Sequence, residues 1–186
     1  MTNEQLTGLI EDCKANKRKA QKKLFELYYR KMYGIAMRYF KSPDECQDAV
    51  QEGFIKLFSK IQMFDYSGSF EGWMRRMFVN TYIDIIRKNK IEPEFDENLM
   101  EHNIADDNIE ENAAEFSLEE IIDALQKLPP SYRTVFNLFY IEGYSHQEIA
   151  QILNVTEGTS KSNLFKAREK MKLALEELRN KKNTNN

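Results

Sequence analysis

The 186-residue sequence has few residues that break helices and few that build covalent or metal sites. It contains seven glycines, four prolines, two cysteines, two histidines and one tryptophan. Scarce glycine and proline, beside 41% hydrophobic and 31% charged residues, favour an all-α protein. Cys13 and Cys46 lack the spacing of metal ligands, so we expect reduced thiols without an assigned role. His102 and His146 have no suitable catalytic neighbours, so we expect no catalytic residue, metal or cofactor and no enzyme.

Long apolar runs are missing as well. No stretch is long enough to cross a bilayer, and the first residues, MTNEQLTGLIEDCK, form neither a basic leader nor an apolar signal core. We therefore expect a cytoplasmic protein without membrane insertion.

Basic residues are absent from segment 91–117, which holds ten acidic residues. The net charge is −3, and it would be +7 without those ten acids, so the flanking parts are basic, as a nucleic-acid partner requires. The segment has no strong helical period. We therefore predict that segment 91–117 is an acidic linker between two small helical domains, 1–90 and 118–180. We also expect a disordered polar tail at 181–186.

A strong helix start lies at Ser42-Pro43-Asp44-Glu45, where a capping box surrounds a proline at the first helical position. The apolar residues of the following helix share one face, whereas Asp48 and Glu52 project from the opposite face with Gln51 at its edge. An acidic ridge would repel DNA, so it predicts a surface for a basic protein partner. The alternative is an ordinary solvated helix face.

An aromatic and polar loop, 62–69, follows this helix and leads into another helix at about 70–90. Basic residues, an amide and loop aromatics together are typical of single-stranded nucleic-acid binding, in which stacking contributes about 1–3 kcal/mol per base. The alternative is that the aromatics are core residues, which we expect for Phe70, Trp73 and Phe78. The candidate residues for strand binding are Phe64, Asp65, Tyr66, Ser67, Arg75, Arg76, Asn80 and Arg87.

The C-terminal part predicts four short helices, of which the last two, within 145–172, form a helix-turn-helix. Ser145 and Glu148 make a capping box, and Thr156 is the candidate N-cap of the last helix. Its apolar positions, which include Ser160, fall on one side and leave a polar face suited to a major groove. The alternative is a helical hairpin with a solvated face. The candidate DNA-contacting residues are Glu157, Thr159, Ser162, Asn163, Lys166 and Lys170.

With these motifs placed, the chain resembles the extracytoplasmic-function (ECF) group of the bacterial sigma-70 family over nearly its whole length. Three stretches carry the resemblance, and their order and separation make it specific. They are DAVQE at 48–52 followed by Phe54, FEGW at 70–73 with Asn80, Asp84 and Arg87, and LPPSYRTVFNLFYIEGYSHQEIAQILNVTEGTSKSNLFKAR at 128–168.

The resemblance implies a role for each part. Asp48, Gln51 and Glu52 would dock on the clamp of the largest subunit of core RNA polymerase, and the second domain would contact the flap of the second largest. Loop 62–69 with Asn80 would capture an unpaired base of the minus-ten element, helix 157–172 would read the minus-thirty-five element, and the linker would run through the polymerase.

The implied function is therefore that of a sigma factor that directs core polymerase to promoter DNA and assists melting. An anti-sigma factor is a further implied partner, as is usual in the group. A stand-alone helix-turn-helix regulator is the alternative, although it leaves the acidic ridge and the aromatic loop unexplained. Two residues depart from the family pattern: Asn163 stands where many relatives have Arg, and Ser160 where many have Val. We expect Ser160 to lie inward and Asn163 to lie at the edge of the groove face.

Overall fold

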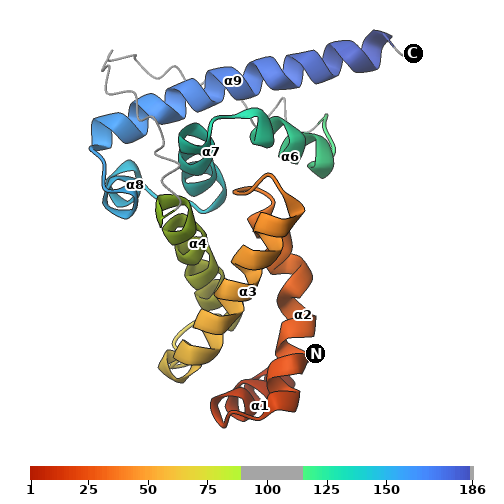
Figure 1. Ribbon diagram of the computed structural model, residues 1–186, viewed down its shortest axis with the longest axis vertical. Helices are drawn as coiled ribbons and strands as arrows, with labels where there is room; N and C mark the ends of the chain where they lie inside the picture. The colour runs from red at the N-terminus through yellow and green to blue at the C-terminus, as the bar shows by residue number, and fades with distance from the viewer. Residues whose placement is uncertain (89–114, 185–186) are drawn as a thin grey trace. The chain divides into compact units, whose positions relative to one another are not determined.

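The computed structural model describes residues 1–88 and 115–184. Within those two ranges every regular element is helical and there is no strand, as the all-α prediction requires. Most of the predicted linker and residues 185–186 of the predicted tail lie outside the described ranges. The chain divides into two compact units, residues 1–88 and 89–186, which are described separately (Figure 1).

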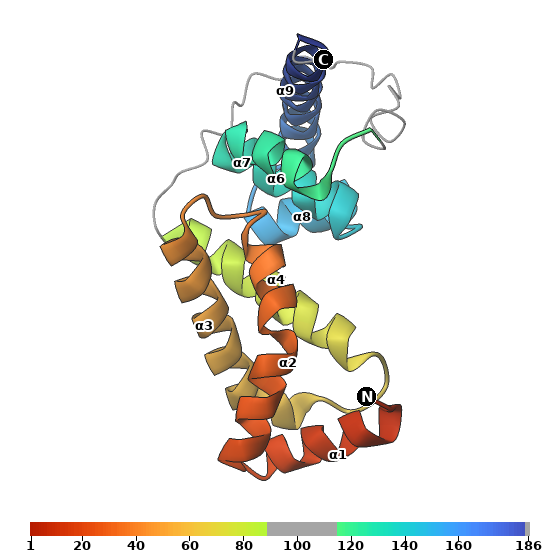
Figure 2. The same ribbon diagram turned by 90° about the vertical axis from the view of Figure 1, so that its right-hand side faces the viewer.

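Unit 1 has three long helices and a shorter one packed across them. Helices α2, α3 and α4 pack on one another, and α1 contacts both α2 and η1, as the ribbon in Figure 2 shows. Side chains from all three long helices, such as Leu24, Leu57 and Phe78, are fully buried between them. The elements are α1 (Asn3–Lys14), α2 (Arg18–Ala36), α3 (Pro43–Lys60), the 3-10 turn η1 (Ile61–Met63) and α4 (Phe70–Lys88).

The contact between α3 and α4 is closest at Gly53. A Cβ atom built on Gly53 would lie 2.5 Å from Cδ1 of Phe78, so the ring of Phe78 occupies the space that any other side chain would fill. That ring also packs edge-on against Phe54 at 5.0 Å and against Tyr82 at 6.0 Å. The missing side chain of Gly53 therefore sets how near the two helices come.

Unit 2 is a four-helix domain that ends in a helix-turn-helix, as predicted. The capping boxes at Ser117 and Ser145 are both present, and Thr156 accepts from the amide of Thr159 at 3.0 Å. Asn154 ends α8 in the left-handed conformation, with φ 56°, and so makes the turn tight. The elements are α6 (Leu118–Lys127), α7 (Pro130–Phe136), the π-helical turn η2 (Asn137–Ile141), α8 (His146–Leu153) and α9 (Glu157–Thr184).

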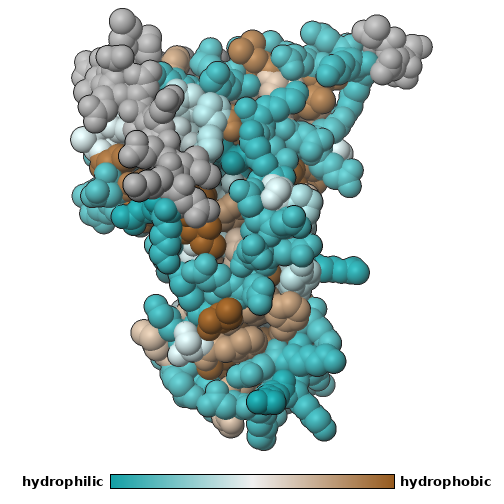
Figure 3. All heavy atoms as spheres, in the orientation of Figure 1, coloured by the Kyte–Doolittle hydropathy of each residue, from teal (hydrophilic) through white to brown (hydrophobic). Residues whose placement is uncertain are grey.

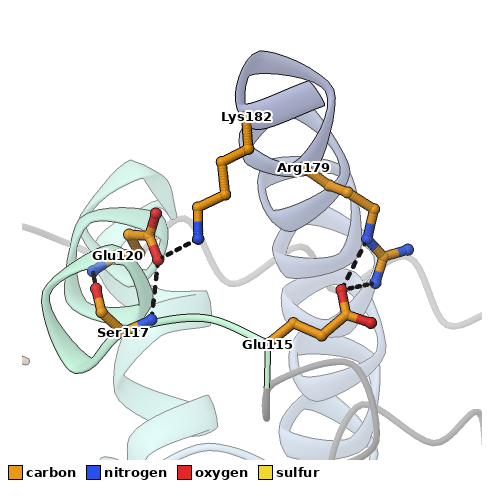
Figure 4. Close-up of polar contacts among 5 residues, drawn as sticks. All are labelled: Glu115, Ser117, Glu120, Arg179 and Lys182. Carbon is orange, nitrogen blue, oxygen red and sulfur yellow. Dashed lines mark hydrogen bonds and ion pairs between the residues drawn. The ribbon is translucent and has the colours of Figure 1, made fainter. Parts of the chain in front are cut away.

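Helix α9 is longer than the sequence pattern indicates. The prediction of a disordered tail from residue 181 is wrong for residues 181–184, because the helix extends to Thr184. Figure 4 shows why the extra turns are held: Lys182 pairs with Glu120 at 2.8 Å and Arg179 pairs with Glu115 at 2.8 Å. Glu120 lies in the first turn of α6 and Glu115 lies just before that helix, so both partners are far away in sequence.

A polar contact joins the two helices of the helix-turn-helix. Nδ1 of His146, on α8, lies 2.9 Å from Oγ of Ser160, on α9, and the imidazole stacks on Phe139 at 4.8 Å. Burial, followed by the charge of Lys161, lowers the pKa of His146, whereas Glu157 opposes the shift. The fold therefore favours the neutral form of His146.

Replacing Gly53 by alanine should lower the free energy of unfolding by about 1–3 kcal/mol, because the new methyl group would overlap the buried ring of Phe78. Gly34→Ala is the matched control: its site in α2 has no atom within 4 Å, and alanine favours helix by up to about 1 kcal/mol. Urea denaturation followed by circular dichroism measures both. Wild-type stability for Gly53→Ala would contradict the close approach of α3 and α4.

Because the folded state lowers the pKa of His146, the unfolded chain takes up its proton first as the pH falls. The stability that neutral His146 provides is present above its ordinary pKa of about 6.5 and is lost below it. His146→Gln should therefore lose less stability than the wild type between pH 7.5 and pH 5.5. Thermal unfolding at the two pH values measures this, and equal losses would show that His146 plays no part.

Candidate nucleic-acid interface

The acidic ridge lies along the outer side of α3. Asp48 and Gln51 are exposed and Glu52 is half exposed, whereas Val50 and Gly53 of the same helix are buried. The helical period separates the two sets, because residues three or four positions apart share a face. The three predicted docking residues therefore lie together on one accessible surface.

A cavity of about 310 Å³ lies between α3 and α4, beside η1. It brings together Arg76 and Asn80, which the sequence predicts as site residues, and residues that the sequence pattern did not single out for strand binding. Three of the lining residues are cationic, and an aromatic ring, an amide and two thioethers accompany them. The lining residues are Lys56, Lys60, Met63, Trp73, Arg76, Met77, Asn80, Thr81 and Asp84.

Lys56 links the cavity to the acidic ridge. Its Nζ lies 3.3 Å from Oδ2 of Asp84, on the opposite wall, and 3.5 Å from Oε1 of Glu52, on the ridge. Spacing alone could have indicated the contact with Glu52, which is four residues away on the same helix. The contact with Asp84 depends on the packing of α3 against α4.

Loop 62–69 presents fewer aromatic rings than the sequence predicts. Phe64 is only 4% exposed, so the expectation that it lies at the surface as a stacking ring is wrong. It packs against Tyr66, Phe70 and Trp73 with centroid separations of 4.8, 5.1 and 5.4 Å, because burying a phenyl ring is favourable wherever such neighbours exist. Tyr66 is 42% exposed.

The polar residues of the loop shape its turn. Oδ1 of Asp65 accepts from the backbone amide of Ser67 at 3.0 Å, and this hydrogen bond is the largest influence that lowers the pKa of Asp65. Met63, just before the turn, is a large apolar residue that is nevertheless 70% exposed. Figure 3 shows apolar residues gathered on the surface of unit 1 within a hydrophilic surround.

The basic residues of α4 do not all face the cavity. Arg76 and Asn80 are four positions apart, and Arg87, a further seven along, continues the same face and is exposed. Arg75 is half buried and absent from the cavity lining, because one position of helix turns a side chain through about 100°. Arg75 therefore lies outside the cavity lining, and its contact with a strand stays a prediction.

Trp73 also differs from its prediction. Phe70 and Phe78 are core residues as expected, but Trp73 is half exposed and forms part of the cavity wall. Its position three residues before Arg76 placed it on the cavity side of α4. An aromatic ring with one open face beside cations is the arrangement on which an unpaired base stacks.

Helix α9 presents only part of its predicted groove face. Glu157 and Lys170 are exposed, and Ser162 and Lys166 are half exposed. Oε1 of Glu157 lies 2.8 Å from Nζ of Lys161, an exposed residue that the sequence analysis did not include among the candidates. Ser162 lies next to Lys161 on this outward face.

Two candidates on α9 lie inward instead. Thr159 is 5% exposed and Asn163 is 0% exposed, so the expectation that they face a groove is wrong. Asn163 is three residues after Ser160 and four before Ala167, and both of those are buried as expected, so helical spacing turns Asn163 inward too. Within the described ranges neither Oδ1 nor Nδ2 of Asn163 has a hydrogen-bond partner.

The described residues contain no cluster of three or more His, Cys, Asp or Glu side chains arranged to hold a metal ion. None of the helices in those ranges combines the length and apolar character that crossing a bilayer requires.

Comparison with known proteins identifies both units. Residues 24–91 match the family model of sigma-70 region 2, and residues 118–171 match that of sigma-70 region 4. The chain is 32% identical to the ECF RNA polymerase sigma factor SigW of Bacillus subtilis over 91% of this chain and 96% of that one. It is also 32% identical to the ECF RNA polymerase sigma-E factor of Haemophilus influenzae, over 89% and 94%.

A solved structure shares the fold. The sigma factor RpoE of Bartonella quintana, crystallised with the anti-sigma factor NepR, is 21% identical with a TM-score of 0.51, over 83% of this chain and 96% of that one. The two matched regions cover more than half of the chain and coincide with the two helical units. The chain therefore belongs to the sigma-70 family and, within it, to the ECF group of RNA polymerase sigma factors.

Proposed function

We propose that this protein is a dissociable initiation subunit that binds core RNA polymerase, directs it to a set of promoters and helps to melt them. The observation that carries the proposal is that unit 1 holds an acidic ridge and a cationic cavity on adjacent sides of α3. A regulator that binds duplex DNA by itself would need only the helix-turn-helix of unit 2. The role involves no chemistry by the protein itself, so it is not that of an enzyme.

The ridge is the docking surface for core polymerase. Asp48, Gln51 and Glu52 would meet a basic surface on the clamp of the largest subunit, where complementary charge fixes partner and orientation. Unit 2 would contact the flap of the second-largest subunit, and segment 91–117 would thread through the enzyme between these points. The protein would act where the polymerase is, in the cytoplasm.

The cavity between α3 and α4 would capture an unpaired base of the non-template strand at the minus-ten element. Lys60 and Arg76 supply cations for the phosphates, Asn80 supplies donors and an acceptor for a base edge, and Trp73 supplies a stacking face. Extruding a base costs a few kcal/mol, so stacking and hydrogen bonds together are needed to hold it. Asp65, Tyr66 and Ser67 follow Met63 of the cavity lining in sequence and would supply further strand contacts, and Arg87 would add a cation further along α4.

Helix α9 would enter the major groove at the minus-thirty-five element. The outward residues Ser162 and Lys166 can reach base edges or phosphates, and Lys170 lies one turn further along for the backbone. Glu157 at the start of the helix pairs with Lys161, which brings a second cation to the groove. Asn163 takes no part in reading, because it is buried.

An anti-sigma factor is a further partner that we propose. The support is the ECF membership of the chain, together with a solved relative of the same fold that was crystallised with an anti-sigma factor.

Reversing one ridge charge should block docking without unfolding the chain. Asp48→Arg should weaken binding to core polymerase at least tenfold, because the ridge would then repel a basic surface. Glu176→Arg is the matched control, since Glu176 is an exposed acid on α9 in unit 2. Fluorescence anisotropy of the labelled protein titrated with core measures both, and wild-type binding by Asp48→Arg would refute the docking surface.

Two outward residues of α9 should differ in how they affect promoters. Lys166→Ala should weaken holoenzyme binding to all promoters and reduce the salt slope by about one, as expected for a phosphate contact. Ser162→Ala should instead change preference at one position of the minus-thirty-five element. Asn163→Ala is the buried control and should leave sequence preference unchanged. Binding to a randomised promoter library decides, and altered preference in Asn163→Ala would refute this orientation of α9.

A further inference from the structure

Helix α1 lies outside residues 24–91, the part of unit 1 that matches sigma-70 region 2. It nevertheless contacts η1, which leads directly into loop 62–69 beside the cavity (Figure 2). The contacts are made by Glu11 and Lys14, near the end of α1. They reach Gln62, Phe64 and Tyr66.

Lys14 makes the central contact. Its Nζ donates to the carbonyl oxygen of Phe64 at 2.9 Å, and the side chain is only 15% exposed. The same ammonium lies 4.4 Å from the ring centroid of Tyr66, in cation–π geometry, and 3.2 Å from Oε1 of Glu11. One cation therefore holds two residues of the loop, and a neighbouring carboxylate compensates its charge.

Tyr66 is the residue that most needs this support. It adopts the left-handed conformation, with φ 64°, which a tyrosine rarely occupies without other contacts to hold it. Its hydroxyl donates to the carboxylate of Glu11, and Nε2 of Gln62 donates to the backbone oxygen of Lys14 at 2.6 Å. Burial and the hydrogen bond to Glu11 raise the pKa of Tyr66 to about 12, so the hydroxyl remains a donor at neutral pH.

The contacts continue from α1 to the cavity. Phe64, whose carbonyl Lys14 holds, packs on Trp73 with ring centroids 5.4 Å apart, and Trp73 forms part of the cavity wall. Met63, next to Phe64 in sequence, lines the same cavity. A shift of the backbone at Phe64 would therefore move two residues of the cavity wall.

We propose that α1 positions the base-capture cavity, and that Lys14 and Glu11 are its positioning residues. This proposal rests on the proposed function of the cavity in promoter melting. By holding loop 62–69 in its bound form beforehand, α1 removes an ordering cost that strand capture would otherwise add to the cost of extruding a base. Neither residue touches the DNA itself.

The experiment uses the full chain and its single tryptophan, Trp73, as the reporter. The variants are Lys14→Met, which removes the cation, and Lys14→Arg, which retains a charged donor. Lys19→Met is the matched control, because Lys19 is an exposed cation on α2 away from the loop. Acrylamide quenching of Trp73 measures access to the cavity in the free protein. Core binding and promoter opening by the holoenzyme, followed with 2-aminopurine at the minus-ten element, measure function.

Lys14→Met should raise the acrylamide quenching constant about twofold and reduce promoter opening about five- to tenfold, as expected for loss of a charge-assisted hydrogen bond. Core binding should change less than twofold, since the ridge on α3 is untouched. Lys14→Arg should recover most of the opening, and Lys19→Met should match the wild type. Tyr66→Phe removes only the hydroxyl bonded to Glu11, so it should reduce promoter opening by only about two- to threefold. This variant tests the proposal if Lys14→Met does not fold.

Normal opening by both Lys14→Met and Tyr66→Phe would overturn the proposal, whether or not Trp73 becomes more accessible. Equal loss of opening in Lys14→Met and Lys19→Met would also overturn it, because general charge would then explain the effect. If the wild-type protein opens no promoter with core polymerase, the proposed function itself fails, and the quenching result then describes packing alone.

Discussion

The close approach of α3 and α4 at Gly53 is the constraint on which unit 1 depends. Because Gly53 has no side chain, the buried ring of Phe78 lies directly against α3. At that separation Lys56 of α3 and Asp84 of α4 come within 3.3 Å and close one side of the cavity. The same helix carries the acidic ridge on its outer side. The acidic ridge and one wall of the cavity are thus built on the same helix.

The two surfaces share a cation. Lys56 contacts Glu52 of the ridge as well as Asp84 of the cavity, and each of these partly exposed ion pairs contributes at most about 1 kcal/mol. So small a contribution to the free energy cannot by itself decide binding at either surface. The position of the loop beside them depends instead on α1, through Lys14 and Glu11.

The helix-turn-helix is held by polar contacts at its start and by apolar packing further along. Thr156 caps α9 and Ser160 lies beside His146, whereas Leu164 and Met171 are buried in the ordinary way. Asn163 is the exception, since it is buried without a partner for its amide, and such burial costs about 1–3 kcal/mol. Fewer polar side chains of α9 are therefore available to a DNA groove than the sequence pattern predicts.

The sequence by itself determined the helices, their capped starts and the division into two units, because capping boxes and helical periods are local properties. It also placed Asp48, Gln51 and Glu52 on one face, since a single helix sets their spacing. Tertiary structure alone decided the cavity, the burial of Phe64 and the role of α1. These depend on which distant elements meet, and a residue such as Lys14 gives no local sign that it will contact a loop fifty residues away. The packing of distant elements determines which side chains are buried, and only the polar and aromatic residues that stay exposed are available to a partner.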